Sequence, residues 1–290
     1  MTSKTRTSGF HRALAGCLAL FTCLAFATVA QPDRTGIAPA QTLVHEAPSD
    51  FNRSVLVVDR GAFRSMRFGS LRGEDQSRIR PGYPKQLPMP YLQSAAVGLA
   101  VPEKLSSALV IGLGGGAFPS FLQAVFPDLQ IDAVEIDPVV AQLARNYFTL
   151  QEGPRLRVHV IDAVEFVQRK STAYDYILLD AYDADDLPAA LTTGEFLDDV
   201  KEQLAGNGVL VVNIAISNDY RSRWLTEQFT ARYAHCLHLR SSPSLNDVLL
   251  LSDAAIPRLS ELRDTAARLD TDDATRRGMR RHISAAASCS

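Results

Sequence analysis

Cysteine is scarce in this chain, with four in 290 residues, and Cys17 and Cys23 lie in an apolar N-terminal stretch. The other two, Cys236 and Cys289, are too few for a disulfide framework, and no Cys/His spacing predicts a metal site. An excess of basic charge is absent as well, because 30 Lys and Arg residues stand against 32 Asp and Glu residues. We therefore expect no bound metal and no nucleic-acid partner.

Uncharged apolar runs of membrane-spanning length are absent except at the N-terminus, where residues 13–30 carry no charge. Basic residues before this run and the small residues of Ala25-Phe26-Ala27 near its end are typical of a secretory signal peptide. The run of 18 residues is also at the lower limit for one membrane-spanning helix. Residues 1–30 are therefore predicted to be a signal peptide or an uncleaved anchor. We expect a periplasmic or secreted protein in the first case and a membrane-anchored one in the second.

The remainder has the composition of an ordinary folded protein, with 46% hydrophobic and 21% charged residues. Within residues 35–90, strand-like runs lie at Thr42–Val44, Val55–Val58 and Phe63–Phe68. They predict a small antiparallel sheet, followed by a loop rich in Gly and Pro. This part is expected to be a small N-terminal β domain.

Residues 91–256 have a different rhythm, in which apolar runs alternate with segments of helical spacing. Tyr91–Ala100 has helical spacing, and five buried strands are predicted after it. The five runs are Ala108–Ile111, Ile131–Val134, Val158–Ile161, Ile177–Leu179 and Val209–Val212. This alternation predicts an α/β fold with a Rossmann-like, mostly parallel sheet.

The last part of the chain departs from this alternation. Cys236–Leu239 and Val248–Leu251 have no clear helix between them, which predicts an antiparallel pair at one edge of the sheet. In residues 257–290 we expect one helix over Leu259–Leu269, followed by a basic tail from Arg276 that frays.

A glycine-rich turn, Gly112-Leu113-Gly114-Gly115-Gly116, follows the first strand of the alternating region. Glycines there allow a sharp turn and a close approach of backbone to ligand, so Gly112 and Gly114 are candidate binding residues. Glu135 ends the next strand, where a carboxylate can accept hydrogen bonds from two ribose hydroxyls. The alternative role, capping the following helix, suits Asp137 better. The turn lacks the G-x-G-x-x-G spacing of a dinucleotide site.

Asp162 and Ala163 end the third predicted strand. The Asp162 carboxylate can accept from an adenine amino group, and the Ala163 N–H can donate to a ring nitrogen. Taken alone, Asp162 is more often a helix cap than a ligand. Beside the glycine turn and Glu135, at the sheet edge where open α/β folds bind ligands, it predicts an adenosine site without phosphates. An S-adenosyl sulfonium compound is such a ligand.

Asp180 ends the fourth predicted strand and opens an acidic stretch that includes Asp183. Because Asp180 follows a buried apolar run, its carboxylate must face a crevice or find a partner. Carboxylates attract and orient an ammonium group and can take its proton. This stretch therefore predicts a cationic amine substrate.

Over about residues 41–252, the chain resembles the spermidine synthase (polyamine aminopropyltransferase) family. The matching segments occur in the same order and at similar spacing. They are Asp59-Arg60-Gly61, Tyr91, the glycine turn, Val134-Glu135-Ile136-Asp137, Asp162-Ala163, Asp180-Ala181-Tyr182-Asp183 and Leu191-Thr192-Thr193-Gly194-Glu195-Phe196. The resemblance implies a class I methyltransferase-type fold.

The family's pattern also implies a nucleoside donor and the residues that hold it. Glu135 would bind the ribose of decarboxylated S-adenosylmethionine, and Asp162 with Ala163 would bind its adenine. The donor is consumed as a co-substrate, so no permanently bound cofactor is implied.

The same pattern implies how the amine reacts. Asp180 would accept the proton that frees the attacking nitrogen, while Tyr91 and Asp183 would place a diamine such as putrescine. Methylthioadenosine would leave as the aminopropyl group is transferred. The partners implied are these small molecules, and the sequence leaves a homodimer open.

Two departures indicate a divergent member of the family, and the predicted signal peptide indicates an exported one. The family's G-G-G-D-G-G loop has an acid where this chain has Gly115, and Ala184-Asp185-Asp186-Leu187 replaces the usual Pro-x-Gly segment. Loss of the loop acid makes a methyltransferase using intact S-adenosylmethionine an alternative. The export signal makes a second alternative, a nucleoside- or polyamine-binding protein without turnover.

Overall fold

The computed structural model describes residues 40–148, 150–169, 172–182, 187–215, 219–241 and 246–289. The predicted signal or anchor in residues 1–30 and the candidate residue Asp183 lie outside these ranges. In the ranges themselves, no helix combines the length and apolar character needed to cross a membrane. Residues 39–290 form one compact unit.

The predicted N-terminal antiparallel sheet is present and has four strands in the order β1-β2-β3-β4. They are β1 (Gln41–Ser49), β2 (Arg53–Arg60), β3 (Phe63–Phe68) and β4 (Ser77–Ile79). Val55 and Val57 of β2 and Met66 of β3 are fully buried and join the main core. The short strand β4 was not predicted, because three residues within a Gly- and Pro-rich loop carry no periodicity.

The second sheet has eight strands in the order β12-β10-β11-β9-β8-β5-β6-β7. Its strands are β5 (Ser107–Ile111), β6 (Gln130–Glu135), β7 (Leu156–Val160), β8 (Tyr174–Leu179), β9 (Leu204–Ala215), β10 (His235–Ser241), β11 (Asn246–Ser252) and β12 (Ala287–Ser288). Strands β7, β6, β5, β8 and β9 are parallel, whereas β11, β10 and β12 extend the sheet in antiparallel pairs. The α/β class, the mostly parallel sheet and the antiparallel edge are thus confirmed.

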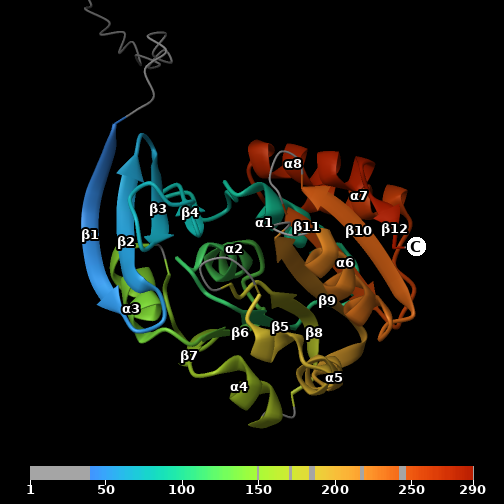
Figure 1. Cartoon of the computed structure of the whole chain (residues 1–290). Helices are drawn as coiled ribbons and strands as arrows, with labels where there is room; N and C mark the ends of the chain where they lie inside the picture. The colour runs from blue at the N-terminus through green and yellow to red at the C-terminus, as the bar shows by residue number, and fades with distance from the viewer. Residues whose placement is uncertain are drawn as a thin grey trace, which may run out of the picture. The chain divides into compact units, whose positions relative to one another are not determined.

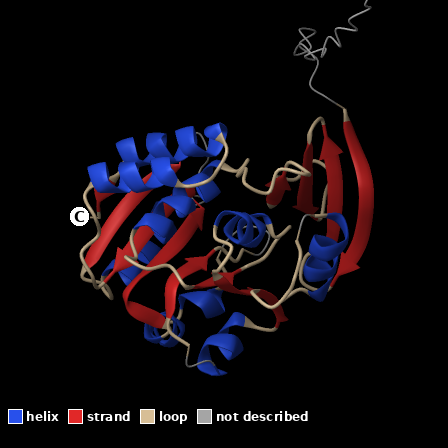
Figure 2. Ribbon diagram, turned by 180° about the vertical axis from the view of Figure 1, so that it is seen from behind, coloured by secondary structure: helices blue, strands red, loops and turns tan. Residues whose placement is uncertain are grey.

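Helices cover both faces of this sheet (Figures 1 and 2). One core joins the sheet to α1, η1, α2, α3, α7 and α8, and a second core on the other face joins it to α4, α5 and α6. The helices are α1 (Pro90–Ala95), η1 (Ala96–Ala100), α2 (Ala117–Val125), α3 (Pro138–Tyr147), α4 (Ala163–Arg169), η2 (Ala189–Thr192), α5 (Gly194–Glu202), α6 (Asp219–Thr230), α7 (Leu259–Arg268) and α8 (Asp273–Ser284).

The expectation of a frayed tail from Arg276 is wrong, because that stretch forms α8 and then β12. Asp272 caps α8 by accepting a hydrogen bond from Thr275 N at 3.0 Å. Met279 and Ile283 recur at helical spacing and are fully buried in the core. The four arginines of α8, at positions 276, 277, 280 and 281, obscured this narrow apolar stripe in the sequence pattern.

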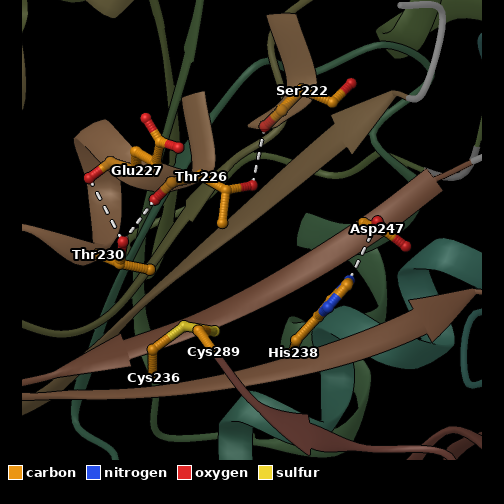
Figure 3. The surroundings of a disulfide bond; sticks show 8 residues. All are labelled: Ser222, Thr226, Glu227, Thr230, Cys236, His238, Asp247 and Cys289. Carbon is orange, nitrogen blue, oxygen red and sulfur yellow. Dashed lines mark hydrogen bonds and ion pairs between the residues drawn. A yellow bond between two sulfur atoms is a disulfide. The ribbon is translucent and has the colours of Figure 1, made fainter. Parts of the chain in front are cut away.

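A disulfide joins Cys236 on β10 to Cys289, which directly follows β12 (Figure 3). The two Cα atoms are 5.4 Å apart, within the usual range for a bridged pair. The bridge links residues 53 positions apart and holds the end of the chain against the antiparallel edge of the sheet. The sequence excluded a framework of several disulfides, and it offered no signal for this single pair.

Candidate active site

A cavity of about 1140 Å³ opens at the carboxyl ends of β5, β6 and β8. The small N-terminal sheet also contributes to its lining, through Phe51 and Asn52 of the turn between β1 and β2 and through Arg78 of β4. Every predicted site residue that the structure describes lines this cavity: Tyr91, Gly112, Gly114, Glu135, Asp162, Ala163 and Asp180. The strand ends therefore bring the candidate nucleoside and amine residues into one space.

Gly112 and Gly114 have positive φ angles, a backbone conformation that residues with a side chain rarely adopt. Their φ angles are +97° and +51°, and a Cβ on Gly112 would lie 2.0 Å from the main-chain oxygen of Asp180. Only glycine permits this close passage between the turn and the end of β8. The turn is thereby held directly against the strand end that carries Asp180.

Glu135 is fixed by the backbone of the glycine turn and of the following helix. Its Oε2 accepts a hydrogen bond from Leu113 N at 3.1 Å, and its Oε1 accepts one from Asp137 N at 3.0 Å. Burial raises the pKa of Glu135, and these backbone N–H groups act in the opposite direction. Asp137 itself caps α3, as its position before Pro138 predicted. The carboxylate is thus oriented toward the cavity, where its remaining lone pairs can accept hydroxyl donors.

Asp162 lies two residues after β7 and begins the turn into α4. Its Oδ1 accepts a hydrogen bond from Val164 N at 2.8 Å, which is the capping geometry weighed above. The same residue and Ala163 line the cavity. The cap is therefore observed, and the role of Asp162 toward adenine stays a prediction.

Asp180 directly follows β8, and its carboxyl group has a strongly shifted pKa. Its Oδ1 accepts a hydrogen bond from Asn213 Nδ2 at 2.8 Å, and the Tyr91 hydroxyl donates a second one. Burial raises the pKa of Asp180 from 3.8 to about 7, although the two hydrogen bonds oppose the shift. Burial and the nearby Asp180 charge raise the pKa of Tyr91, so the phenol remains a donor. A carboxyl group with this pKa can take up or release a proton near neutral pH.

Asn213 on β9 organises this carboxylate and was missed from the sequence. Its Oδ1 accepts a hydrogen bond from Asn246 Nδ2 at 3.0 Å, which turns its Nδ2 toward Asp180. The Tyr182 hydroxyl donates to the main-chain oxygen of Asn213. A polar residue that directly follows the buried run Val209–Val212 is the signal that could have found it, by the argument already applied to Asp180.

Other side chains occupy the space beside position 115. A Cβ on Gly115 would lie 2.6 Å from the ring of Phe148 and 3.0 Å from Ser77 Oγ. The Phe148 side chain is buried and occupies the space that a longer residue would need. The glycine is therefore matched by its surroundings, and an acid at this position would require them to move.

Residues 95–227 match the model of the spermine/spermidine synthase domain. A polyamine aminopropyltransferase of Vibrio vulnificus is 38% identical over 177 residues, which cover 59% of this chain and 59% of that protein. The match spans about three fifths of the length of that protein and of a polyamine aminopropyltransferase of Neisseria meningitidis.

Solved structures share the fold. A probable spermidine synthase of Corynebacterium glutamicum superposes with a TM-score of 0.65 at 20% identity, covering 80% of this chain and 89% of that chain. Human methyltransferase-like protein 13, solved in complex with SAH, superposes with a TM-score of 0.57 at 24% identity, covering 67% and 92%. The large sheet and its helices are thus of the class I methyltransferase type.

Proposed function

Since residues 95–227 match the model of the spermine/spermidine synthase domain, we propose that the chain is an aminopropyltransferase acting on an amine. The donor is decarboxylated S-adenosylmethionine, the acceptor a diamine such as putrescine, and the leaving product methylthioadenosine. One observation carries the proposal: Asp180, with a pKa of about 7, faces the same cavity as the glycine turn and Glu135.

The chemistry is a displacement at carbon. The amine nitrogen attacks the methylene beside the sulfonium, the C–S bond breaks, and its electron pair leaves on the sulfur of methylthioadenosine. An alkylammonium has a pKa of about 10.4, so almost none of it is nucleophilic at neutral pH. Asp180 accepts the proton that the nitrogen loses, and the hydrogen bond from Tyr91 helps to orient that carboxylate.

The cavity also suits an adenosyl co-substrate. Glu135 is held with lone pairs available to ribose hydroxyls, and Asp162 and Ala163 line the cavity where the adenine would lie. A methyltransferase of the same fold was solved in complex with SAH, which supports an adenosyl compound as a ligand of this fold. Asp183 would complete the amine site, as the resemblance implies.

The direct test is release of methylthioadenosine by the purified protein supplied with decarboxylated S-adenosylmethionine and putrescine. Formation of spermidine in equal amount is the expected result. Release of S-adenosylhomocysteine from intact S-adenosylmethionine would establish the methyltransferase alternative instead. Tight calorimetric binding of methylthioadenosine or spermidine, with no product from either donor, would establish a binding protein without turnover.

Asn213→Asp is expected to move the acidic limb of the pH–rate profile upward by at least about one pH unit, because a second buried carboxyl beside Asp180 disfavours its ionisation. At pH 6 the rate of methylthioadenosine release should fall about tenfold. The measurement is kcat/KM from pH 5.5 to 9. Asn207→Asp, on an exposed part of β9, is the matched control and should leave the profile unchanged. An unshifted limb in Asn213→Asp would show that Asp180 does not set it.

We also propose that the protein is exported and works in an oxidising compartment. The Cys236–Cys289 disulfide supports this location, because such bonds persist outside the reducing cytosol. Cell fractionation of the full chain, combined with thiol labelling under denaturing conditions, tests the proposal. A protein found with the cytosolic fraction and with both thiols reduced would contradict it.

A further inference from the structure

Arg78 is the single cationic side chain among the described residues that line the cavity. The acidic side chains around it are Glu74, Asp75, Glu135, Asp162 and Asp180. Acids suit the sulfonium and ammonium groups of the proposed substrates, so they need no further explanation. A guanidinium in the same space does, because it would repel a ligand that carries only positive charge.

Arg78 lies on β4, beside the glycine turn. Its neighbour Ser77 packs against that turn, with the Ser77 Cβ 3.2 Å from a Cβ placed on Gly114 and its Oγ 3.0 Å from one placed on Gly115. The Arg78 guanidinium therefore lies on the side of the cavity next to the glycine turn, where the substrates are proposed to bind.

The charge of Arg78 is not cancelled by its ion pair. Asp75 Oδ1 lies 2.6 Å from Arg67 Nε, while Asp75 Oδ2 accepts from Arg78 Nε at 2.7 Å and from Ser65 Oγ at 2.8 Å. Burial acts to raise the pKa of Asp75, but the hydrogen bonds from Arg67, Ser65 and Arg78 outweigh it and lower that pKa. One carboxylate thus faces two guanidinium groups, which leaves one positive charge.

The exposed member of this trio is Arg78. The side chains of Arg67 and Asp75 are 6% and 4% exposed, whereas that of Arg78 is 36% exposed. Arg78 uses Nε and Nη2, its side-on edge, toward Asp75. Among the described residues Nη1 has no acceptor, so the end-on edge, formed by Nη1 and Nη2, remains available. That edge matches the two oxygens of a carboxylate.

We propose that Arg78 binds a substrate carboxylate, which is a group that decarboxylated S-adenosylmethionine and putrescine both lack. The inference rests on the displacement proposed above and replaces one of its two substrates with a carboxylated counterpart. The carboxylate belongs either to the amino-acid part of intact S-adenosylmethionine or to the α-carbon of a diamino acid acceptor.

The displacement is balanced in both cases. The acceptor nitrogen bonds to the methylene carbon, the C–S bond breaks, methylthioadenosine leaves with the electron pair, and the proton passes from nitrogen to Asp180. With intact donor the transferred group is 3-amino-3-carboxypropyl. With a diamino acid acceptor it is aminopropyl, and the acceptor keeps the carboxylate.

The test measures methylthioadenosine release for four substrate pairs, combining intact or decarboxylated donor with putrescine or ornithine, which is α-carboxylated putrescine. We expect one carboxylated pair to exceed the uncarboxylated pair at least tenfold in kcat/KM, and the identity of that pair names the source of the carboxylate. Arg78→Gln should erase this preference through KM, and Arg78→Lys, which keeps the charge beside Asp75, should restore part of it. Arg72→Gln, an exposed residue of the preceding loop, is the matched control.

Equilibrium binding separates this inference from the proposed function. If no pair yields methylthioadenosine, the proposed aminopropyl transfer fails, and calorimetry with the same four compounds still tests Arg78. At least tenfold weaker binding of a carboxylated compound to Arg78→Gln, with its uncarboxylated counterpart unaffected, supports the inference. A wild-type preference for the uncarboxylated compounds, or equal losses for both kinds in Arg78→Gln, overturns it.

Discussion

Replacing Asp180 with Asn is expected to lower methylthioadenosine release about a thousandfold, within the range that general bases contribute. The amide keeps the shape of the side chain, and its oxygen can still accept the hydrogen bond from Asn213. It cannot accept the proton of the attacking nitrogen. In the wild type, kcat/KM should fall as the pH drops below about 7, where Asp180 becomes protonated.

The same variant is expected to gain stability, and the sign follows from the pKa shift. Because the pKa of Asp180 rises from 3.8 to about 7 on folding, the folded state holds a proton that the unfolded state has released between these values. The contribution of Asp180 to the free energy of unfolding is therefore largest below about pH 4 and is lost as the pH rises to about 7. Asn at this position has no such loss, so at pH 8 the variant should be more stable by roughly 1–4 kcal/mol.

Thermal unfolding at pH 5, 6, 7 and 8 measures this difference beside the activity assay. Asp128→Asn, which changes a fully exposed acid, is the matched control and should alter neither activity nor the pH trend. Two results would contradict the assignment of Asp180 as the proton acceptor: more than a tenth of wild-type activity in Asp180→Asn, or a rate independent of pH between 6 and 8.

The fold was predictable where the hydrophobic pattern of a segment follows directly from its place in the folded protein. Buried parallel strands such as Ala108–Ile111 and Ile177–Leu179 are continuous apolar runs, because helices cover them on both faces. Their carboxyl ends meet at one edge, so polar residues immediately after them were expected to converge. Gly112, Glu135 and Asp180 do line one cavity for that reason.

The parts that were not predictable depend on partners distant in sequence. The position of Asn213 after a buried run marks it as a candidate, but the direction of its amide toward Asp180 depends on Asn246, which is distant in sequence. The Arg78 guanidinium enters the cavity from β4, a strand too short to leave a periodic pattern. The sequence shows only that Gly115 stands where the family has an acid. It does not show that the ring of Phe148 fills the space beside this glycine.

The double variant Cys236→Ser/Cys289→Ser is expected to lower the free energy of unfolding by about 2–4 kcal/mol, the usual contribution of a disulfide that closes a loop of this length. The bridge spans 53 positions and fastens the chain end, through β12, to β10. For a chain of this size such a loss corresponds to a decrease in Tm of roughly 5–15 °C. Thermal unfolding measures it, and wild-type protein with dithiothreitol should show the same lower Tm.

This effect on stability should leave the chemistry at 25 °C nearly unchanged, because neither cysteine lines the cavity. The bridge instead fixes the end of the C-terminal segment that includes α8. Helix α8 in turn contacts the loop and helix α1 on either side of Tyr91. Thr275 on α8 accepts a hydrogen bond from Leu87 N at 2.9 Å, and the Leu87 oxygen in turn accepts one from Gln93 at 2.7 Å. Activity of the double variant should therefore be lost at a lower temperature than in the wild type, in parallel with its unfolding. An unchanged Tm would show that losing the bridge frees only β12, and inactivity at 25 °C would show that the bridge shapes the site itself.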